Sequence, residues 1–429
     1  MDSFLLILNT FKEFLSLFIL IWWVWLPVFL YFLFYSAVQN YTHLKYRLSL
    51  EWVLLEMKIP REVTKSPRAM EQVFTGLHGV YTLSIKWHAK LFKGKIPDWF
   101  SFEMIGKGGE IHFYIRTQKK YKNIVEAQIY AQYPAAEVYE VPDYINDMPM
   151  YLPNDQYDLW GTDLILNKED AYPIRTYPDF EEKSAGKDDV KRLDPMASLS
   201  ELFTTLHAGE QIWVQILGAP TGDDWIKRGQ LVLDKIMGKE GSPLTGNLFS
   251  DAVFAIDKAI SGVVPSPVNE KGEKIEKKKE KEKERVSLSP GKQDTIKAME
   301  KSWDKLGYQT GIRFLYIGPK DDFQQSNVAG VVGAFRQFSS QNLNGFKMNK
   351  HTLTYAKGLF KTSKLFNKKT SIFQAFRERK LFGTGFTPFV LNTEELATIF
   401  HFPDVGVRAP LLPRVETKRG EPPVGLPIN

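Results

Sequence analysis

A basic segment with interleaved aromatic residues is the part of this sequence best suited to bind a ligand. Residues 361–380 hold seven lysines and arginines against one glutamate, and Phe360, Phe366, Phe373 and Phe376 alternate with them. Such charges neutralise phosphates of nucleic acid or of anionic lipid, and aromatic faces stack on exposed bases. The candidate anion-binding residues are Lys361, Lys364, Lys368, Lys369, Arg377, Arg379 and Lys380. The pattern equally fits a helix with buried phenylalanines and a solvated charged face.

The chain lacks the local motifs of common catalytic and metal sites. No G-x-x-x-x-G-K-[ST] sequence offers backbone amides, a lysine and a hydroxyl to a nucleotide. Neither H-E-x-x-H nor G-x-S-x-G occurs, cysteine is absent, and the seven histidines are scattered. We therefore predict that the protein is not an enzyme and binds neither a cofactor nor a metal, although catalytic groups can converge without a local motif.

An uncharged apolar run from Phe14 to Tyr35 determines where these residues are held. About 20 apolar residues suffice to cross the hydrocarbon core of a bilayer. A cleaved signal peptide is the alternative, but Asp2 lies near the start, the run is too long, and no A-x-A sequence follows it. The sequence predicts a single transmembrane anchor over residues 1–38.

The charges that flank this run predict its orientation. Lys45, Arg47 and Lys58 follow the run, whereas Lys12 before it is offset by Glu13. An excess of lysine and arginine marks the cytoplasmic side of a membrane helix. We expect a single-pass protein of the cell membrane whose large C-terminal part is cytoplasmic.

Beyond the anchor, helical and strand periodicities are mixed. Residues 39–57 are predicted to continue as an amphipathic helix, and Met70, Val73, Phe74 and Leu77 predict another. Strands are predicted at 99–105, 111–115, 137–141, 163–167, 211–217 and 311–317, and the turn GKGG at 106–109 predicts that the first two form a hairpin. Helices are predicted at 121–133, 199–206, 226–237, 248–260, 294–306 and 327–338. This order predicts an α+β fold in which tandem ferredoxin-like α/β layers follow the transmembrane helix.

Shifts in composition divide the chain into units. A Lys/Glu run has only Ile275 to bury, so it is predicted to stay solvated. The predicted units are the anchor (1–38), juxtamembrane helices (39–95), a first α+β domain (96–264), a charged linker (265–289), a second α+β domain (290–404) and a proline-containing extended tail (405–429). Strands 211–217 and 312–317 are candidates for equivalent positions in an internal duplication.

The segment 389–403, FVLNTEELATIFHFP, resembles the stretch that precedes the motor domain in HerA/FtsK-type conjugative ATPases, the coupling ATPases of type IV secretion. Segments 55–62, 69–74 and 210–216 are similar to the membrane-proximal part of the same family. Asn392 or Thr393 is suited to be the N-cap of a helix that carries Glu394 and Glu395 in its first turn.

The resemblance implies a function for the whole chain. The family continues into a P-loop motor, whereas this chain ends at Asn429, so we expect the non-catalytic anchor and scaffold of a motor encoded separately. The candidate docking residues are Glu394, Glu395, His401, Pro403 and Arg414. The alternative is a membrane-tethered module that binds nucleic acid or anionic lipid through residues 361–380. DNA and a second copy of the chain remain open as partners.

Overall fold

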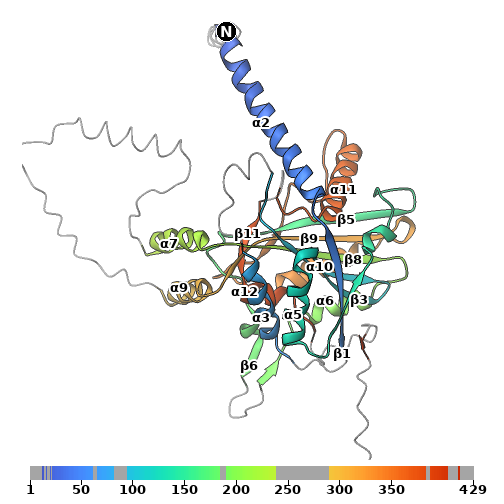
Figure 1. Ribbon diagram of the computed structural model, residues 1–429, viewed down its shortest axis with the longest axis vertical. Coiled ribbons are helices and arrows are strands. Elements are labelled where there is room, and N and C mark those ends of the chain that lie inside the picture. Colours follow the sequence, from blue (N-terminus) through green and yellow to red (C-terminus); the bar gives the residue numbers. More distant parts are fainter. Residues whose placement is uncertain are drawn as a thin grey trace, which may run out of the picture.

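A long helix stands away from a body that is built on one large sheet (Figure 1). The computed structural model describes residues 22–60, 65–81, 94–183, 190–237, 289–382, 387–403 and 414–415, with the isolated positions 12, 13, 16 and 20. The predicted α+β class and the N-terminal apolar helix are confirmed. The predicted helix 248–260, nearly all of the charged linker and most of the tail lie outside the described residues.

Helix α2 (Trp22–Leu48) is long and apolar enough to cross a membrane. Its 27 residues contain Pro27, and none of its described side chains is buried in the protein. Large apolar side chains such as Trp23, Phe32 and Phe34 are exposed instead. An exposed apolar helix of this length, about 40 Å at 1.5 Å per residue, requires an apolar environment.

Ten strands form the main sheet in the order β10-β5-β9-β8-β2-β3-β1-β12, with β11 on β9 and β4 on β1. Their bounds are β1 Trp52–Pro60, β2 Phe100–Lys107, β3 Glu110–Gln118, β4 Glu137–Val141, β5 Tyr157–Leu166, β8 Gln211–Pro220, β9 Gly307–Pro319, β10 Phe346–Met348, β11 Phe389–Asn392 and β12 Arg414–Val415. Neighbours are antiparallel except β12, which is parallel to β1. A separate hairpin joins β6 (Glu181–Lys183) to β7 (Val190–Arg192).

The predicted hairpin is confirmed. Strands β2 and β3 pair from Ser101 opposite Arg116 to Lys107 opposite Glu110. Gly108 and Gly109 make the turn with φ of 56° and 92°, values that glycine adopts without a steric penalty.

The predicted juxtamembrane helix 39–57 is confirmed only as far as Leu48. The juxtamembrane helix ends at Leu48, and residues 52–60 form strand β1 instead. Val53, Leu55, Met57 and Ile59 are all buried in one core cluster. Their spacing is the period of two that a strand requires. This segment therefore belongs to the sheet and not to the stem of the anchor.

The predicted separation into two layered domains differs from the sheet that is observed. Strands β8 and β9, which are predicted to lie in different domains, pair along ten positions from Gln211 opposite Ile317 to Pro220 opposite Tyr308. They are central neighbours in one sheet. The tandem ferredoxin-like layering is not confirmed.

Helices cover both faces of this sheet. Their bounds are α3 Arg68–Leu77, α5 Lys122–Gln132, α6 Ala197–Thr204, α7 Asp224–Ile236, α9 Pro290–Trp303, α10 Gln325–Arg336, α11 Lys361–Arg377 and α12 Thr393–Ile399. Side chains of α3, α5, α6, α10 and α12 share one core cluster with one face. The other face packs on α11 and the turn Tyr144–Asp147. Successive side chains of strand β8 point to opposite faces of the sheet, since Val214 lies in the first cluster and Trp213 in the second.

Candidate membrane-proximal site

Helix α11 contains most of the predicted anion-binding segment, and its two ends lie in different surroundings. The C-terminal end packs on the sheet through Ile372, Phe373 and Phe376, which are buried. The N-terminal end, from Lys361 to Lys364, is exposed. We call the buried end, with the following residues to Leu381 and the side chains of the sheet and its turns that surround them, the root of α11. We call residues 357–364 its tip.

Arg379 fixes the root to the sheet. Its side chain is 2% exposed, and its guanidinium donates to Glu103 on β2 (Nε to Oε1, 3.0 Å; Nη2 to Oε2, 3.2 Å). The same guanidinium donates a second pair of hydrogen bonds to Asp143 (Nη1 to Oδ2, 2.6 Å; Nη2 to Oδ1, 2.9 Å). Two bidentate pairs on one arginine give both strength and a fixed orientation. The residue has a left-handed backbone (φ 47°), so these bonds hold a conformation that arginine rarely adopts.

A second buried arginine binds the end of the same helix. Arg313 on β9 donates to Asp163 on β5 (Nε to Oδ1, 2.7 Å) and to the backbone oxygens of Ala375 (2.7 Å) and Lys380 (3.4 Å). Gln215 donates to the oxygen of Phe376 at 3.1 Å. The last carbonyls of a helix have no partner within it and carry partial negative charge. Arginine and glutamine side chains of the sheet therefore cap the root of α11.

The charges of the root perturb one another. Burial raises the pKa of Glu103, but the adjacent Arg379 outweighs it, so the net pKa lies below its usual value. The pKa of Asp143 is lowered in the same way, its hydrogen bonds to Arg379 outweighing burial. Burial, aided by the positive charge of Arg379, lowers the pKa of Arg116 to about 10. The guanidinium of Arg116 lies 4.3 Å from the ring centre of Trp52. The root is thus a mutually neutralised cluster of charges.

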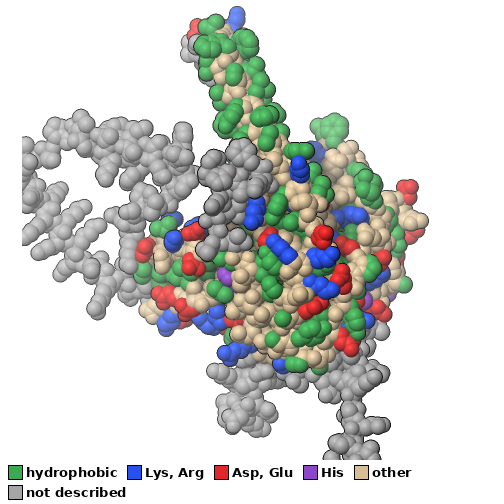
Figure 2. All heavy atoms as spheres, viewed as in Figure 1, with side chains coloured by type: hydrophobic (Ala, Val, Ile, Leu, Met, Phe, Trp, Pro, Cys, Tyr) green, Lys and Arg blue, Asp and Glu red, His purple; other side chains and the backbone are tan. Residues whose placement is uncertain are grey.

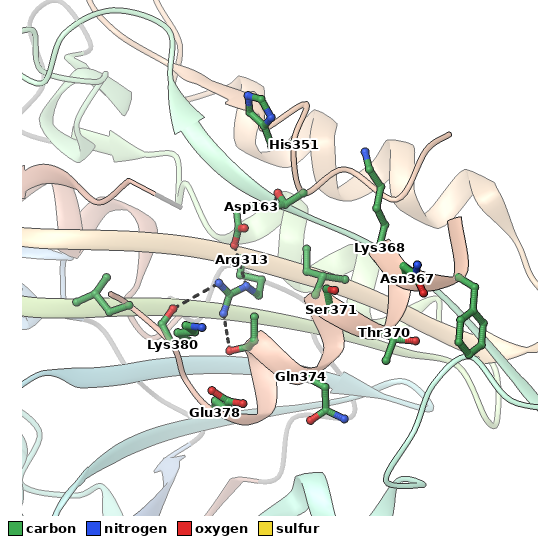
Figure 3. A pocket seen from close by; sticks show the side chains of 15 residues that line it. Asp163, Arg313, His351, Asn367, Lys368, Thr370, Ser371, Gln374, Glu378 and Lys380 are labelled. Atoms are coloured by element: carbon green, nitrogen blue, oxygen red, sulfur yellow. Dashed lines mark hydrogen bonds and ion pairs between the residues drawn. The ribbon is translucent and has the colours of Figure 1, made fainter. Parts of the chain in front are cut away.

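A cavity of about 650 Å³ lies beside α11, between this helix and strands β5 and β9. Figure 3 shows Arg313 and Asp163 at its floor and polar residues of α11 along its wall. Two of the cations here, Lys368 and Arg313, already have partners. Lys368 donates to the backbone oxygens of Leu353 (3.0 Å), Tyr355 (3.2 Å) and Lys350 (3.4 Å), and Arg313 is engaged as described. Among the described residues, no group of His, Asp and Glu side chains is arranged to hold a metal ion.

The C-terminal end of α2, which we call its foot, contacts the root of α11. Arg47 forms an ion pair with Glu378 (3.3 Å), and His43 Nδ1 lies 2.8 Å from the backbone oxygen of Gly94. A cavity of about 530 Å³ separates the two helices at this point and is lined by Trp99, among others. The C-terminal ends of both helices thus lie at one corner of the body.

The seven predicted basic residues divide between structural and exposed roles. Lys369 pairs with Asp158 at 2.5 Å, Arg377 lies over the ring of Phe373, and Lys368 and Arg379 are bound as described. Lys380 is half-buried beside the cavity. Lys361 and Lys364 are exposed, and no ion pair joins either to another described residue. The structure therefore leaves the tip, rather than the whole segment, accessible to an anion.

The segment 389–403 lies inside the body. Asn392 caps α12 by accepting from the amide of Glu395 (2.9 Å), and Glu395 accepts from the amide of Asn392 (2.8 Å), a complete capping box. Glu394 is buried and accepts from the hydroxyl of Thr176 (2.7 Å). Burial raises the pKa of Glu395 to about 8, despite the backbone amides of Asn392 and Ile174 that bind it.

The other predicted docking residues are placed as follows. His401 is buried between the oxygen of Ala397 (2.8 Å) and Asp194 (2.9 Å), and Pro403 is buried as well. Arg414 lies on β12 opposite Ile59. The side chains of Glu394, Glu395 and His401 are bound within this chain, so we do not propose them as contacts for a partner.

A family model for a domain of unknown function, DUF8128, matches residues 37–410. The chain belongs to this family. The match covers the body except β12, includes both ends of α11 and begins within α2, so it omits the whole apolar run from Phe14 to Tyr35. No curated protein matches the chain.

Sequence reasoning missed most of the root in this DUF8128 chain. Glu103, Asp163, Gln215 and Arg313 are polar residues at buried positions of apolar strands. Glu103 stands between Phe102 and Met104, and this interruption of an apolar run was the available signal. The sequence could not show that Arg379, far along the chain, is its partner.

Proposed function

We propose that this protein is a single-pass membrane scaffold that recruits a P-loop translocation ATPase of the type IV secretion or conjugation kind, carried on another chain. The observation that supports the proposal is that helix α2 and strand β12 lie at opposite ends of the body. Strand β1 starts at Trp52, close to the foot of α2, and ends at Pro60. Strand β12 pairs with Ile59 and Pro60, so Arg414 and Val415 lie at the end away from α2 (Figure 1).

This placement suits a scaffold. The apolar helix leaves one end of the body toward a membrane, and the segment that leads to the motor in the resembling ATPases reaches the opposite end. A motor bound there has room beneath the membrane. The flanking Lys45 and Arg47 favour a cytoplasmic location for that side, where ATP is available. The resemblance of residues 389–403 supplies the class of partner.

The proposal is tested by purifying the tagged full chain from detergent-solubilised membranes of its own cells. We expect a P-loop ATPase to co-purify and to be identified by mass spectrometry. Deleting residues 410–429 removes β12 and should reduce that capture severalfold while the body keeps its melting temperature. Lys227→Ala, at an exposed site on α7, is the matched control and should capture the ATPase fully. Absence of any P-loop ATPase, or undiminished capture by the deletion variant, would contradict the proposal.

The alternative, a module for nucleic acid or anionic lipid, is supported by the exposed Lys361 and Lys364. A patch of so few cations neutralises few phosphates, and the affinity of a protein for nucleic acid grows with the number of phosphates that it neutralises. A membrane surface is a more suitable partner, because α2 would hold the tip close to it and each lysine adds to the attraction.

A further inference from the structure

The tip of α11 exposes large apolar side chains that have no place in the core. Leu359 is 83% exposed and Phe360 is 77% exposed, the highest values among the large hydrophobic residues of the described body. Phe360 has φ 61° and ψ 32°, a left-handed conformation that a bulky residue adopts only at a steric cost. Gly358 precedes them with φ 81°. The backbone therefore turns these two side chains outward at a cost that packing within the chain does not repay.

The tip and α2 point the same way. Both helices have their C-terminal ends on the body, where Arg47 and Glu378 join them, and both rise from it toward their N-terminal ends (Figure 1). Figure 2 shows hydrophobic side chains on α2 and again on the projecting end of α11. The two apolar surfaces thus lie on one side of the molecule.

The length of α11 matches the distance to a bilayer. At 1.5 Å per residue its 17 residues span about 25 Å. The distance along α2 from Arg47 back to Tyr35, where the apolar run ends, is about 18 Å. Even a tilted α11 therefore brings its tip to the level at which α2 would enter the hydrocarbon.

The charged residues of the tip and of the segment around it in sequence are all positive. Lys357, Lys361 and Lys364 are exposed, and no aspartate or glutamate occurs from residue 352 to residue 377. Lys357 also lies 5.5 Å from the ring centre of Tyr355, which is half exposed. Lysines around a small apolar tip are typical of segments that dip into an anionic membrane surface.

We propose that the tip of α11 is a second membrane contact, in which Leu359 and Phe360 enter the boundary between headgroups and acyl chains while Lys357, Lys361 and Lys364 bind phosphates of anionic lipids. This inference rests on the membrane anchoring by α2. The contact fixes the body against the bilayer at two points, α2 and the tip. A body fixed in this way cannot rotate freely about α2, so the end that carries β12 faces directly away from the membrane.

The absence of cysteine from the chain makes a direct test simple. The full chain is placed in lipid nanodiscs with an environment-sensitive NBD label at a single introduced cysteine, using Phe360→Cys for the tip and Val28→Cys for α2. Leu193→Cys is the control, because Leu193 is half exposed and follows β7, whose partner β6 lies at the end away from α2 (Figure 1). Nitroxide-labelled lipid then reports contact by quenching.

We expect quenching at positions 28 and 360 and none at position 193. In nanodiscs of phosphatidylcholine alone the quenching at 360 should fall, and phosphatidylglycerol should restore it unless Lys361 and Lys364 are replaced by alanine. Quenching at 28 without quenching at 360 would overturn the second contact and leave the anchor intact. Absence of quenching at both positions would overturn the anchor and the inference together. A response at 360 to a DNA duplex but not to lipid would show that the tip binds nucleic acid instead.

Discussion

The root and the tip of α11 carry side chains of the same kinds in opposite surroundings. At the root, Arg379 and Phe376 are buried against the sheet, and the arginine is paired with two carboxylates. At the tip, Lys361 and Phe360 are exposed and have no partner of that kind among the described residues. The difference lies in what the sheet presents to the helix. A basic residue near Glu103 becomes a structural clamp, and the same charge a few turns away remains available to a ligand.

Helix α12 adds a third case. Glu395 is buried like Arg379, but among the described residues only backbone amides, and no cation, bind its carboxylate. The charge of the root is neutralised by its neighbours, whereas that of Glu395 is not. The two sites should therefore respond to pH in opposite directions.

Removing the clamp should have the largest effect on stability. Arg379→Ala leaves Glu103 buried without its cation, and breaking a buried pair from one side costs about 3–5 kcal/mol in the free energy of unfolding. Lys364→Ala at the tip should change it by less than about 0.5 kcal/mol. Denaturant unfolding of the full chain in detergent micelles, followed by tryptophan fluorescence, measures both. Equal effects of the two variants would remove the distinction between root and tip.

The pKa of Glu395 predicts a loss of stability on the alkaline side. It lies at about 8 in the folded chain against 4.5 for an unperturbed group, so the folded state binds more protons between these values. The free energy of unfolding should then fall by a few kcal/mol as the pH rises from about 5 to 8.

Glu395→Gln is the control for this effect. Glutamine at this position still completes a capping box but does not titrate. The variant should be less stable than the native chain at pH 5, because one backbone amide loses its acceptor. It should also show a flatter pH profile, so this difference should shrink as the pH rises toward 8. An unchanged slope between pH 5 and 8 would mean that Glu395 is ionised in the folded protein at neutral pH.

The carboxylates of the root predict the opposite response, in acid. The pKa of Asp143 is lowered in the folded chain, so its contribution is present above its unfolded value and is lost as the pH falls through the folded one. Asp143→Asn should cost about 1.5–3 kcal/mol at pH 7, the usual range for hydrogen bonds to a charged group. That difference should shrink below pH 4. A cost that stays constant into acid would show that Asp143 acts through shape and not through charge.

Much of the fold could be predicted from local pattern, whereas the site could not. The hairpin at Gly108, helix α3 and the cap of α12, expected at Asn392 or Thr393 and found at Asn392, depend on residues close in sequence, and local pattern predicts each of them. The pairing of β8 with β9 joins segments separated by a long insertion, and the pairing of Arg379 with Glu103 joins residues 276 positions apart. Composition shows that a segment is basic, but burial and partners decide which of its charges stay free.

The smallest expected effect concerns the ion pair that joins the two projecting helices. Arg47 and Glu378 are partly exposed, with side chains 23% and 49% accessible, so solvent screens their attraction. Pairs of this kind contribute about 0.2–1 kcal/mol, and Glu378→Ala should lower the free energy of unfolding by no more than that. A double-mutant cycle with Arg47→Ala isolates the coupling, and this coupling should weaken as salt is raised.

The pair between Arg47 and Glu378 also matters for orientation, because it lies where α2 and α11 leave the body. In nanodiscs, Glu378→Ala should therefore broaden the distribution of distances between spin labels at positions 28 and 360 while leaving stability nearly unchanged. A coupling well above 1 kcal/mol would show that this pair is as strong as the buried pairs of Arg379. An unchanged distance distribution would show that packing alone orients the two helices.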